Sequence, residues 1–526
     1  MKFEAATLPD SPESLKEIIL DLQDRIEGLE ASYQKETSIL YEQLRLLRAK
    51  LFGRKSEKIP PDSTVEVLPL FDMPEPEGEE AGPEEIPVKG HQRKKGGRKP
   101  LPADLPRVEK VHDIADSEKT CGCGCPLTRI GEEVSEQLDI VPARMQVIRH
   151  IRPKYACKCC EGALDEGPTV KIAPVQPQLI PKSIATAGLL AFIMTGKFID
   201  HLPFYRQEKQ FSRLGVKISR SSMSTWAMQA AQACIPLLNL LHDELLAANA
   251  INIDETTVQV LKEPGRDPTS NSYMWIFRRG DPDKQVLLYQ YHPTRAGDVA
   301  ADFLGEYTGY VQTDGYSGYD FLDHKEGVVH IGCFAHARRY FADIVKARGK
   351  KGKSGSADVA LSYIRKLYRL EKQFRENELR PEEVYRQRQE YAKPILDSFH
   401  EWLLKQSTRT LPKGLLGKAI TYSLNQWKRL VGYIEDGHLA IDNNMAENSI
   451  RPFVVGRKNW LFAGTPEGAE ASAALYSLIE TAKANGIEPY SYLRHIFEEL
   501  PKAQSLQDYE ALLPWNAKEH IAALVR

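Results

Sequence analysis

The chain has 526 residues, of which 42% are hydrophobic, and a formal net charge of −2. This length predicts several domains, and the apolar content is sufficient for true cores. A net charge near zero excludes a globally basic DNA-coating protein, so contacts with nucleic acid must come from local patches. The N-terminus lacks a signal-peptide pattern, and the longest apolar run, near 189–194, is far shorter than the roughly 20 residues that span a bilayer. We therefore expect a cytoplasmic protein with no membrane contact.

Residues 11–52 have the heptad pattern of a helix that pairs with another helix. Glu36 and Gln43 interrupt an otherwise apolar seam at heptad a and d positions: Leu15, Ile19, Leu22, Ile26, Leu29, Tyr33, Leu40 and Leu47. Such a seam predicts a short coiled coil whose function is dimerisation. The alternative is an amphipathic helix that packs on its own protein.

Residues 53–107 have the composition of a disordered linker, acidic first and basic later. The stretch 59–90 is rich in Pro and acidic residues, with Lys89 as its only basic residue, so it cannot bury a core. A basic cluster around two glycines follows and contains the candidate DNA-binding residues Arg93 and Arg98. The cluster is similar to a minor-groove hook. We favour a phosphate contact that reads no sequence.

Residues 108–175 contain most of the cysteines of the chain. Six of the eight lie between Cys121 and Cys160, and in a reducing compartment such clustering indicates metal rather than disulfides. Thiolates at short spacing can close a tetrahedral Zn²⁺ site that stabilises a segment too small to fold alone. The best four ligands for this structural zinc are Cys121, Cys123, Cys157 and Cys160, which leave Cys125 and Cys159 spare. The alternative is clustering by chance.

Residues 176–246 predict a helical segment that binds DNA. A helix over about 203–214, a turn at Gly215 and a second helix capped by Ser219 are typical of a helix-turn-helix-like unit. Arg220 and Ser222, early in the second helix, are the candidate DNA contacts. The alternative is a helical hairpin with ordinary core packing of Leu214, Met223 and Trp226.

From residue 250 the pattern changes from helix to strand. Three β runs (251–261, 272–280 and 284–292) precede alternating helices and strands, which predicts an α/β, ribonuclease-H-like core whose first part is 247–348. In this fold the first and fourth strands are neighbours. Asp254 lies in the first strand, and Asp314 follows the fourth, where α/β sheets place ligands.

Each of these acids has a simpler interpretation. Asp314 could be a turn former. Asp254 competes with its neighbour Glu255, since either side chain could face inward. Further on, the pair Cys333 and His336 predicts a structural or hydrogen-bonding role.

Arg338 and Arg339 follow this pair and are expected to lie nearer to DNA than it does. The remaining core residues come after a long insertion. A helical insertion, 349–437, could clamp DNA or build a dimer interface. Residues 438–466 form the core helix, and 467–526 a helical C-terminal extension whose first two helices join near 485–487.

The core helix has a distinctive polar face. Asp442 can cap it, and Pro452 should stop or kink it. Helical spacing aligns Asn443, Glu447 and Arg451, with Arg457 and Lys458 following as phosphate contacts, so Arg451, Arg457 and Lys458 are candidate DNA-binding residues. A carboxylate beside these cations makes sense if a divalent metal lies between it and phosphate. The alternative is a capped surface helix with solvated charges.

Several stretches together resemble one family, the insertion sequence 66 family transposases. The stretch DNNMAENSIRPFVVGRKNWLF at 442–462 is similar to their catalytic signature, with Asn448 where the family tends to have Arg. IGEEVSEQLD and RHIRPKYAC resemble the family's zinc-finger region, DET and TDGY its two Asp motifs, and CFAHARR a further motif. The resemblance implies that Asp254, Asp314 and Glu447 form a catalytic Asp-Asp-Glu triad. It further implies two bound Mg²⁺ or Mn²⁺ ions.

The function that this resemblance implies is DNA transposition. We expect metal-dependent cleavage at the ends of the insertion sequence and transfer of the strand into target DNA, in a bacterial, nucleoid-associated setting. The partners would be double-stranded DNA, a second copy of the chain in a homodimer or higher oligomer, and accessory proteins where the reaction needs them. One alternative is a structure-specific nuclease that hydrolyses but never joins. Another is a non-catalytic DNA-binding repressor or scaffold.

Overall fold

The computed structural model describes residues 11–52, 145–156, 170–279, 284–348 and 354–525. The chain divides into two units, one made of residues 1–55 and 152–526 and the other of residues 56–151. All helices and strands described below belong to the first unit. Within the described residues, no helix is long and apolar enough to cross a membrane.

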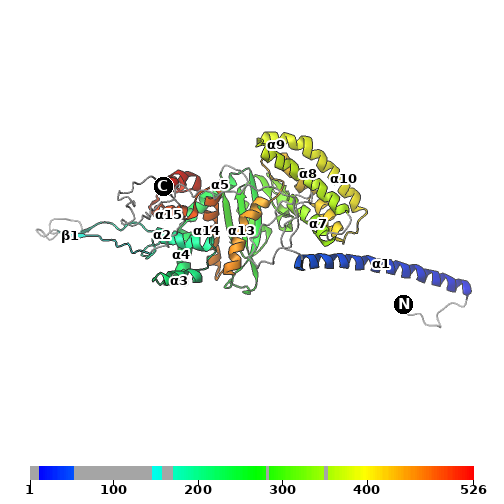
Figure 1. Cartoon of the computed structure of the whole chain (residues 1–526), viewed down its shortest axis with the longest axis horizontal. Coiled ribbons are helices and arrows are strands. Elements are labelled where there is room, and N and C mark those ends of the chain that lie inside the picture. The colour runs from blue at the N-terminus through cyan, green and yellow to red at the C-terminus, as the bar shows by residue number, and fades with distance from the viewer. Residues whose placement is uncertain (1–10, 53–144, 157–169, 280–283, 349–353, 526) are drawn as a thin grey trace, which may run out of the picture. The chain divides into compact units, whose positions relative to one another are not determined.

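A five-stranded sheet forms the centre of the first unit (Figure 1). Its strands are β3 (Ala250–Gln259), β4 (Asn271–Arg279), β5 (Leu287–His292), β6 (Gly309–Gln312) and β7 (Val328–Ile331), in the order β5-β4-β3-β6-β7. The pairs β3–β4 and β4–β5 are antiparallel, whereas β3–β6 and β6–β7 are parallel. The three predicted β runs and the pairing of the first strand with the fourth are therefore confirmed.

Helices cover both faces of this sheet. α13 (Asn444–Trp460) packs on β3 and β4, and α14 (Pro466–Ala484) packs on β5. On the other face, the ring of Phe277 stacks on Phe303 of α6 (Gly297–Leu304), and Trp275 meets Tyr319 of the 3₁₀ segment η3 (Ser317–His324) edge-on. Alternate side chains of β4 thus pack against the helices on opposite faces of the sheet. This is the period-2 pattern of a strand that is buried on both sides.

Side chains of α14 complete the outer edge of the sheet. The Thr481 hydroxyl accepts a hydrogen bond from the Leu287 amide and donates one to its carbonyl, each at 3.0 Å. Ser477 accepts from the Tyr289 amide at 2.8 Å, and Asn485 donates to the Gln285 carbonyl at 2.7 Å. A bare edge strand exposes unpaired backbone groups that invite aggregation, so these contacts take the place of a sixth strand.

The helical segment before the sheet shares its hydrophobic core. It contains α2 (Ala187–Phe198), α3 (Phe204–Arg213), α4 (Arg220–Ala233) and α5 (Ile235–Leu246), and the C-terminal helix α15 (Pro489–Glu499) packs against α2. The predicted helix, turn and helix are confirmed: Gly215 has a φ of 85°, and Ser219 caps α4 by accepting from the Ser222 amide at 3.0 Å. Two further helices, α16 (Leu506–Ala511) and α17 (Pro514–Val525), end the chain after a short 3₁₀ turn, η6 (Leu500–Lys502).

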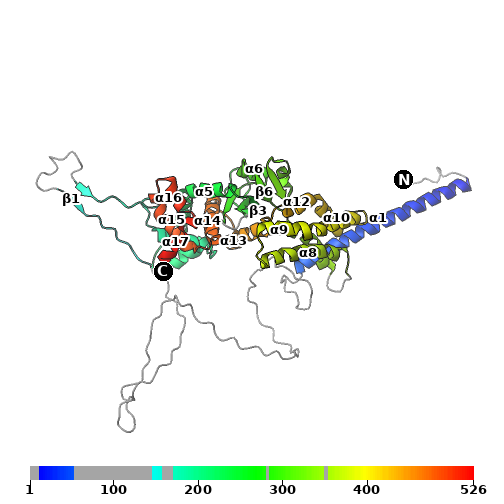
Figure 2. The same cartoon turned by 90° about the horizontal axis from the view of Figure 1, so that it is seen from above.

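The helical insertion forms a second hydrophobic core together with α7 (Phe334–Arg348) and with Ala250 and Ile331 of the sheet. The insertion follows α7 in sequence, and Phe334 and Phe341 of α7 belong to this second core. α8 and α10 lie side by side in both views (Figures 1 and 2). Its elements are α8 (Ser356–Glu376), α9 (Pro381–Gln387), the π-helical turn η4 (Arg388–Ala392), α10 (Lys393–Ser407), α11 (Leu415–Asn425), α12 (Trp427–Val431) and the 3₁₀ turn η5 (Gly432–Glu435).

The N-terminal helix α1 (Pro12–Phe52) confirms the predicted helix over 11–52. Six residues of its apolar seam are 54–72% exposed: Ile19, Ile26, Leu29, Tyr33, Leu40 and Leu47. This exposure leaves the seam available to a partner helix, and the pairing itself stays a prediction. In the predicted zinc-binding segment, β1 (Lys154–Ala156) and β2 (Val170–Ile172) form a two-stranded antiparallel sheet. The four predicted zinc ligands and the two arginines Arg93 and Arg98 lie outside the described residues.

Candidate active site

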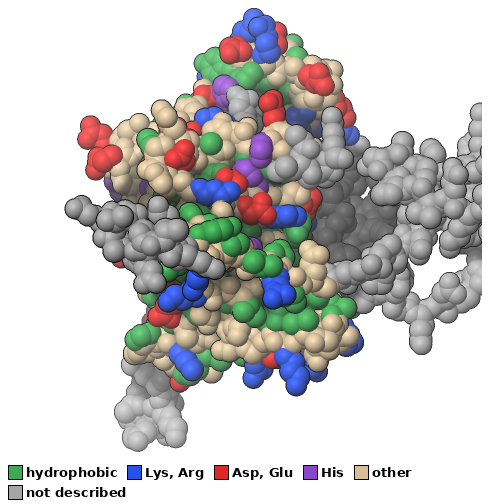
Figure 3. Space-filling view, turned by 90° about the vertical axis from the view of Figure 1, so that its left-hand side faces the viewer, with side chains coloured by type: hydrophobic (Ala, Val, Ile, Leu, Met, Phe, Trp, Pro, Cys, Tyr) green, Lys and Arg blue, Asp and Glu red, His purple; other side chains and the backbone are tan. Residues whose placement is uncertain are grey.

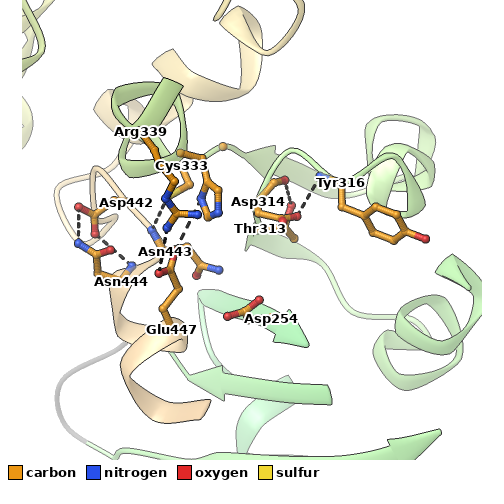
Figure 4. Close-up of polar contacts among 12 residues, drawn as sticks. Asp254, Thr313, Asp314, Tyr316, Cys333, Arg339, Asp442, Asn443, Asn444 and Glu447 are labelled. Carbon is orange, nitrogen blue, oxygen red and sulfur yellow. Dashed lines mark hydrogen bonds and ion pairs between the residues drawn. The ribbon is translucent and has the colours of Figure 1, made fainter. Parts of the chain in front are cut away.

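Three acidic side chains from distant parts of the chain converge at one end of the parallel strands: Asp254, Asp314 and Glu447, here called the carboxylate centre (Figure 4). Asn252 of β3 pairs with Gln312 of β6, so Asp254 and Asp314 each lie two residues beyond a paired position on neighbouring parallel strands. Glu447 lies in the first turn of α13, which packs on β3.

The pKa of Asp254 reports how crowded this centre is. Burial raises it well above the usual range, and the charges of Glu255, Glu447 and Asp314 raise it further. Within the described residues, no Lys or Arg forms an ion pair with Asp254, which is held by a hydrogen bond from the Glu255 amide at 2.9 Å. A buried carboxylate among like charges favours its neutral form unless a cation joins it. The site therefore has the character of a cation site.

A buried amide network sets the spacing of the three acids. Asn252 donates from its side-chain nitrogen to Gln312 at 2.8 Å and to Asn443 at 3.0 Å. Asn443 in turn donates to the backbone carbonyl of Ile253 at 2.8 Å. These amides precede Asp254, Asp314 and Glu447 by two, two and four residues, so the network fixes β3, β6 and α13 in register beneath the acids. Buried polar networks of this kind specify one arrangement when every member is bonded.

The helix that carries Glu447 differs from its prediction in two ways. α13 begins at Asn444 and its N-cap is Asn443, so Asp442 is not the capping residue. Asp442 nevertheless accepts a hydrogen bond from the Asn444 amide at 3.1 Å. Pro452 was expected to stop or kink the helix, and it does not stop it, because α13 continues through it to Trp460. The lost backbone hydrogen bond is offset by burial of Ala446, Ile450 and Phe453 on the same helix.

Glu447 is surrounded by cationic and imidazole groups. Its carboxylate lies 3.7 Å from Nη2 of Arg339 and 3.7 Å from Nδ1 of His336. Burial raises the pKa of Glu447, while Arg339 and Arg451 lower it. Arg339 and Arg451 thus partly neutralise this carboxylate, and the effect of Arg451 on Glu447 agrees with their predicted spacing along the helix.

The choice between Asp254 and Glu255 follows from the face each one occupies. Glu255 forms an ion pair with Arg295 and accepts a hydrogen bond from the Tyr319 hydroxyl, so it faces η3 and not α13. Arg295 stacks on the ring of Tyr316 at 3.7 Å from its centroid and approaches Asp314 at 4.0 Å. Asp314 also accepts a hydrogen bond from the Tyr316 amide at 2.9 Å, as a turn former would, and its role in the site stays a prediction.

The candidate DNA-binding residues occupy several places. Arg457 donates to the hydroxyls of Thr256 and Thr257 on β3, at 3.2 and 3.0 Å, while Lys458 is exposed. The charge of Arg338 lowers the pKa of Asp442. It is Arg339 that faces Glu447.

The predicted helix-turn-helix-like unit exposes the start of its second helix. Arg220 is exposed there and Ser222 is half-buried, whereas Met223 and Trp226 are buried in the core. α4 itself packs against α14. On the face turned toward the viewer in Figure 3, basic side chains are scattered among apolar ones and do not form one continuous patch.

The fold and the site together define an α/β protein with a three-carboxylate centre suited to hard divalent cations, flanked by arginines. Residues 182–471 match the model described as "Transposase IS66 family", and residues 118–161 match "zinc-finger binding domain of transposase IS66". Residues 477–515 match "IS66 C-terminal element", and 39–109 match "Transposase C of IS166 homeodomain". The chain belongs to the IS66 transposase family, which makes it a DNA-processing protein.

Curated relatives extend this similarity to nearly the whole chain. The uncharacterized protein y4jD of Sinorhizobium fredii is 30% identical and aligns over 98% of both chains. The uncharacterized protein y4qI of the same organism is 29% identical over 98% of this chain and 99% of the relative, and y4hP is 31% identical over 83% and 80%. The zinc-finger match supports a structural zinc and includes all four predicted cysteine ligands.

Proposed function

We propose that the chain is an Asp-Asp-Glu DNA transposase with a ribonuclease-H-like core, which cleaves DNA at the ends of its insertion sequence and transfers the strand into a target. The strand order β5-β4-β3-β6-β7, with three antiparallel strands followed by two parallel ones, supports this assignment of the core. The observation that carries the proposal is the convergence of Asp254, Asp314 and Glu447, of which Asp254 forms no ion pair with any described Lys or Arg.

Asp254, Asp314 and Glu447 would hold two Mg²⁺ or Mn²⁺ ions through their carboxylate oxygens. Such a pair, when bound, activates the attacking oxygen and stabilises the leaving one in phosphoryl transfer. The chain's own contribution is to keep the three acids at a fixed spacing. The amides of Asn252 and Asn443 hold the strands and α13 in place, so the site need not reorganise during the reaction.

Basic residues on α13 would hold the DNA strand. Arg451 lies one turn after Glu447, and Arg457 and Lys458 follow two turns later on the same helix. Arg457 is oriented by two threonine hydroxyls of β3, so its position is fixed relative to Asp254. Contacts from arginine and lysine to phosphate fix the register of the DNA without reading its sequence. The scissile phosphate would then lie over the carboxylate centre.

The remaining segments would assemble and position the complex. α1 would pair with a second copy of the chain through its exposed seam. The zinc-binding segment, with Cys121, Cys123, Cys157 and Cys160 as ligands, and the helical segment, with Arg220 and Ser222, would contact the element ends. Arg93 and Arg98 would add phosphate contacts that make binding dependent on salt.

The test uses DNA that carries the inverted repeats bordering the gene. Asp254→Asn should abolish Mg²⁺-dependent cleavage and leave end binding largely intact, because the amide keeps the shape of the side chain but lacks the negative charge that holds the metal pair. Strand transfer from pre-cut ends separates a transposase from a nuclease that only hydrolyses. Full cleavage by Asp254→Asn would refute the catalytic role. Hydrolysis without any strand transfer would refute the transposase and leave a nuclease.

A further inference from the structure

A second set of metal-ligating atoms lies beside the carboxylate centre. The Sγ of Cys333, a ring nitrogen of His336 and a carboxylate oxygen of Glu447 all lie within 4.8 Å of one another. Cys333 immediately precedes α7 and His336 lies in its first turn, so their three-residue spacing turns both toward the same side. Glu447 reaches them from the first turn of α13 (Figure 4). Two helix starts thus bring three different donors together.

Two of these donors have polar atoms that nothing else satisfies. Nδ1 of His336 and Oε1 of Glu447 are buried and have no hydrogen-bond partner among the described residues. They lie 3.7 Å apart, which is too far for a hydrogen bond between them. Buried polar atoms almost always find a partner, and unpaired ones call for an explanation such as an ion. A cation between them would satisfy both atoms at once.

The third donor is already oriented. Sγ of Cys333 accepts a hydrogen bond from the Asn443 amide at 3.2 Å, which points the sulfur toward the start of α13. Burial raises the pKa of the Cys333 thiol, so the sulfur carries its proton until a metal displaces it. The charged groups that act on this position are Asp442 and Glu447 beside Cys333, and Arg339 and Asp314 beside His336. A cation bound here would therefore face more negative than positive charge.

The donor set selects a class of metal. Sulfur and imidazole nitrogen are ligands of zinc and similar ions, whereas Mg²⁺ takes oxygen ligands and avoids thiolate. Zinc bonds of about 2.0–2.3 Å in a tetrahedron place the ligand atoms roughly 3.3–3.6 Å apart, so the three atoms need to close by about 1 Å. Three protein ligands also leave a fourth position open.

We propose that Cys333, His336 and Glu447 form a binding site for one zinc-class ion, and that this ion competes with the Mg²⁺ or Mn²⁺ pair for Glu447. Binding replaces the S–H bond of Cys333 with a sulfur–metal bond and releases the proton to solvent. The Glu447 carboxylate cannot fully coordinate ions in both sites at once, so bound zinc would inhibit the enzyme. The competition rests on the proposed function, whereas the binding site does not.

Metal binding by the full-length protein tests the site without any activity. Co²⁺ is the probe, because its thiolate complexes absorb light, and the bound stoichiometry is measured by elemental analysis. Cys333→Ser should bind one ion fewer than the wild type and lose the corresponding part of the thiolate absorption. The matched control is Cys234→Ser, since Cys234 is the other free buried cysteine of the described residues and has no such ligands around it. The zinc-finger cysteines contribute equally to all three proteins.

Equal stoichiometry in Cys333→Ser and the wild type would overturn the site. His336→Asn provides a second variant should Cys333→Ser fail to fold, as judged by circular dichroism, and it should lose the same ion. An unchanged stoichiometry in a folded His336→Asn protein would be equally decisive.

The competition is measured in a Mg²⁺-dependent cleavage assay with added Zn²⁺. The zinc concentration that halves the rate should be at least about tenfold higher for Cys333→Ser than for Cys234→Ser, since loss of a ligand weakens metal affinity at least that far. No difference between these variants, in proteins that differ by one bound ion, would refute the competition and leave the site intact. A wild type that never cleaves would instead refute the proposed function.

Discussion

Arg388 joins the helical insertion to the segment that leads into α13, and replacing it tests whether the insertion supports the carboxylate centre. The residue is 2% exposed, and its guanidinium donates to both carboxylate oxygens of Glu371, at 2.9 and 2.7 Å. It also donates to the backbone carbonyls of Tyr433, Asp436 and Leu439, at 2.7–2.8 Å. One side chain therefore fixes α8 against the loop that precedes α13.

The magnitude follows from what Arg388→Met leaves behind. Glu371 becomes a buried charge without a counter-ion, which costs about 3–5 kcal/mol. The three carbonyls also lose their donor, at about 1–3 kcal/mol for each that water does not reach. We therefore expect the free energy of unfolding to fall by at least about 3 kcal/mol. Adding Glu371→Leu removes the unpaired charge and should restore about 2 kcal/mol of that loss.

Urea denaturation measures this effect. The fluorescence of Trp402 and Trp427 reports on the second core, against which both side chains pack. Arg386→Met is the matched control, because Arg386 is exposed on the neighbouring α9 and its replacement should change stability by less than about 0.5 kcal/mol. DNA cleavage by Arg388→Met should also slow at temperatures where the protein remains folded. This follows because the loop ahead of Glu447 is no longer held.

Either of two results would contradict this expectation. Arg388→Met could unfold within about 1 kcal/mol of the wild type, below the cost of an unpaired buried charge. Alternatively, the double variant could be no more stable than the single one.

Three further predictions concern the sheet and the site. The folded pKa of Asp254 lies above its unfolded value of about 3.9, so metal-free protein loses stability as pH rises from the unfolded pKa through the folded one. Asp254→Asn should therefore have a higher melting temperature than the wild type at pH 7 in EDTA, and this difference in melting temperature should shrink toward pH 4. An equal difference at both pH values would contradict this. Tyr368→Phe removes the 2.7 Å hydrogen bond to Asp442 and should lower the free energy of unfolding by about 1 kcal/mol, as measured by thermal melting. It should also slow DNA cleavage. Wild-type stability and wild-type cleavage would show that this hydrogen bond contributes to neither. Thr481→Val leaves the amide and carbonyl of Leu287 unpaired and should cost about 1–3 kcal/mol in urea denaturation, whereas Ser472→Ala, on the same helix and bonded only within it, should be near neutral.

The sheet and two of its acids could be predicted because their signals are local. Alternating apolar runs give the strands, and Asp314 stands directly after a strand, where α/β sheets place ligands. The face of Asp254 could not be found this way. Adjacent residues of a strand point to opposite layers, and only the position of α13 shows that Asp254 faces the centre while Glu255 faces Arg295.

Other features depend on contacts between distant segments. Asn252, Gln312 and Asn443 look like ordinary polar residues, and their network exists only once three elements meet. Pro452 does not end α13, because its local cost is outweighed by packing of the helix on the sheet. The contacts of the insertion with the segment before α13 could not be predicted either, since Arg388 binds, besides Glu371, backbone carbonyls that have no sequence signature.

The most direct test of the central claim is to locate manganese in the DNA-bound, full-length protein by anomalous diffraction. We expect two manganese peaks about 3.5–4 Å apart, in contact with the carboxylates of Asp254, Asp314 and Glu447. Peaks that leave Glu447 untouched, or manganese bound only elsewhere on the chain, would contradict this claim.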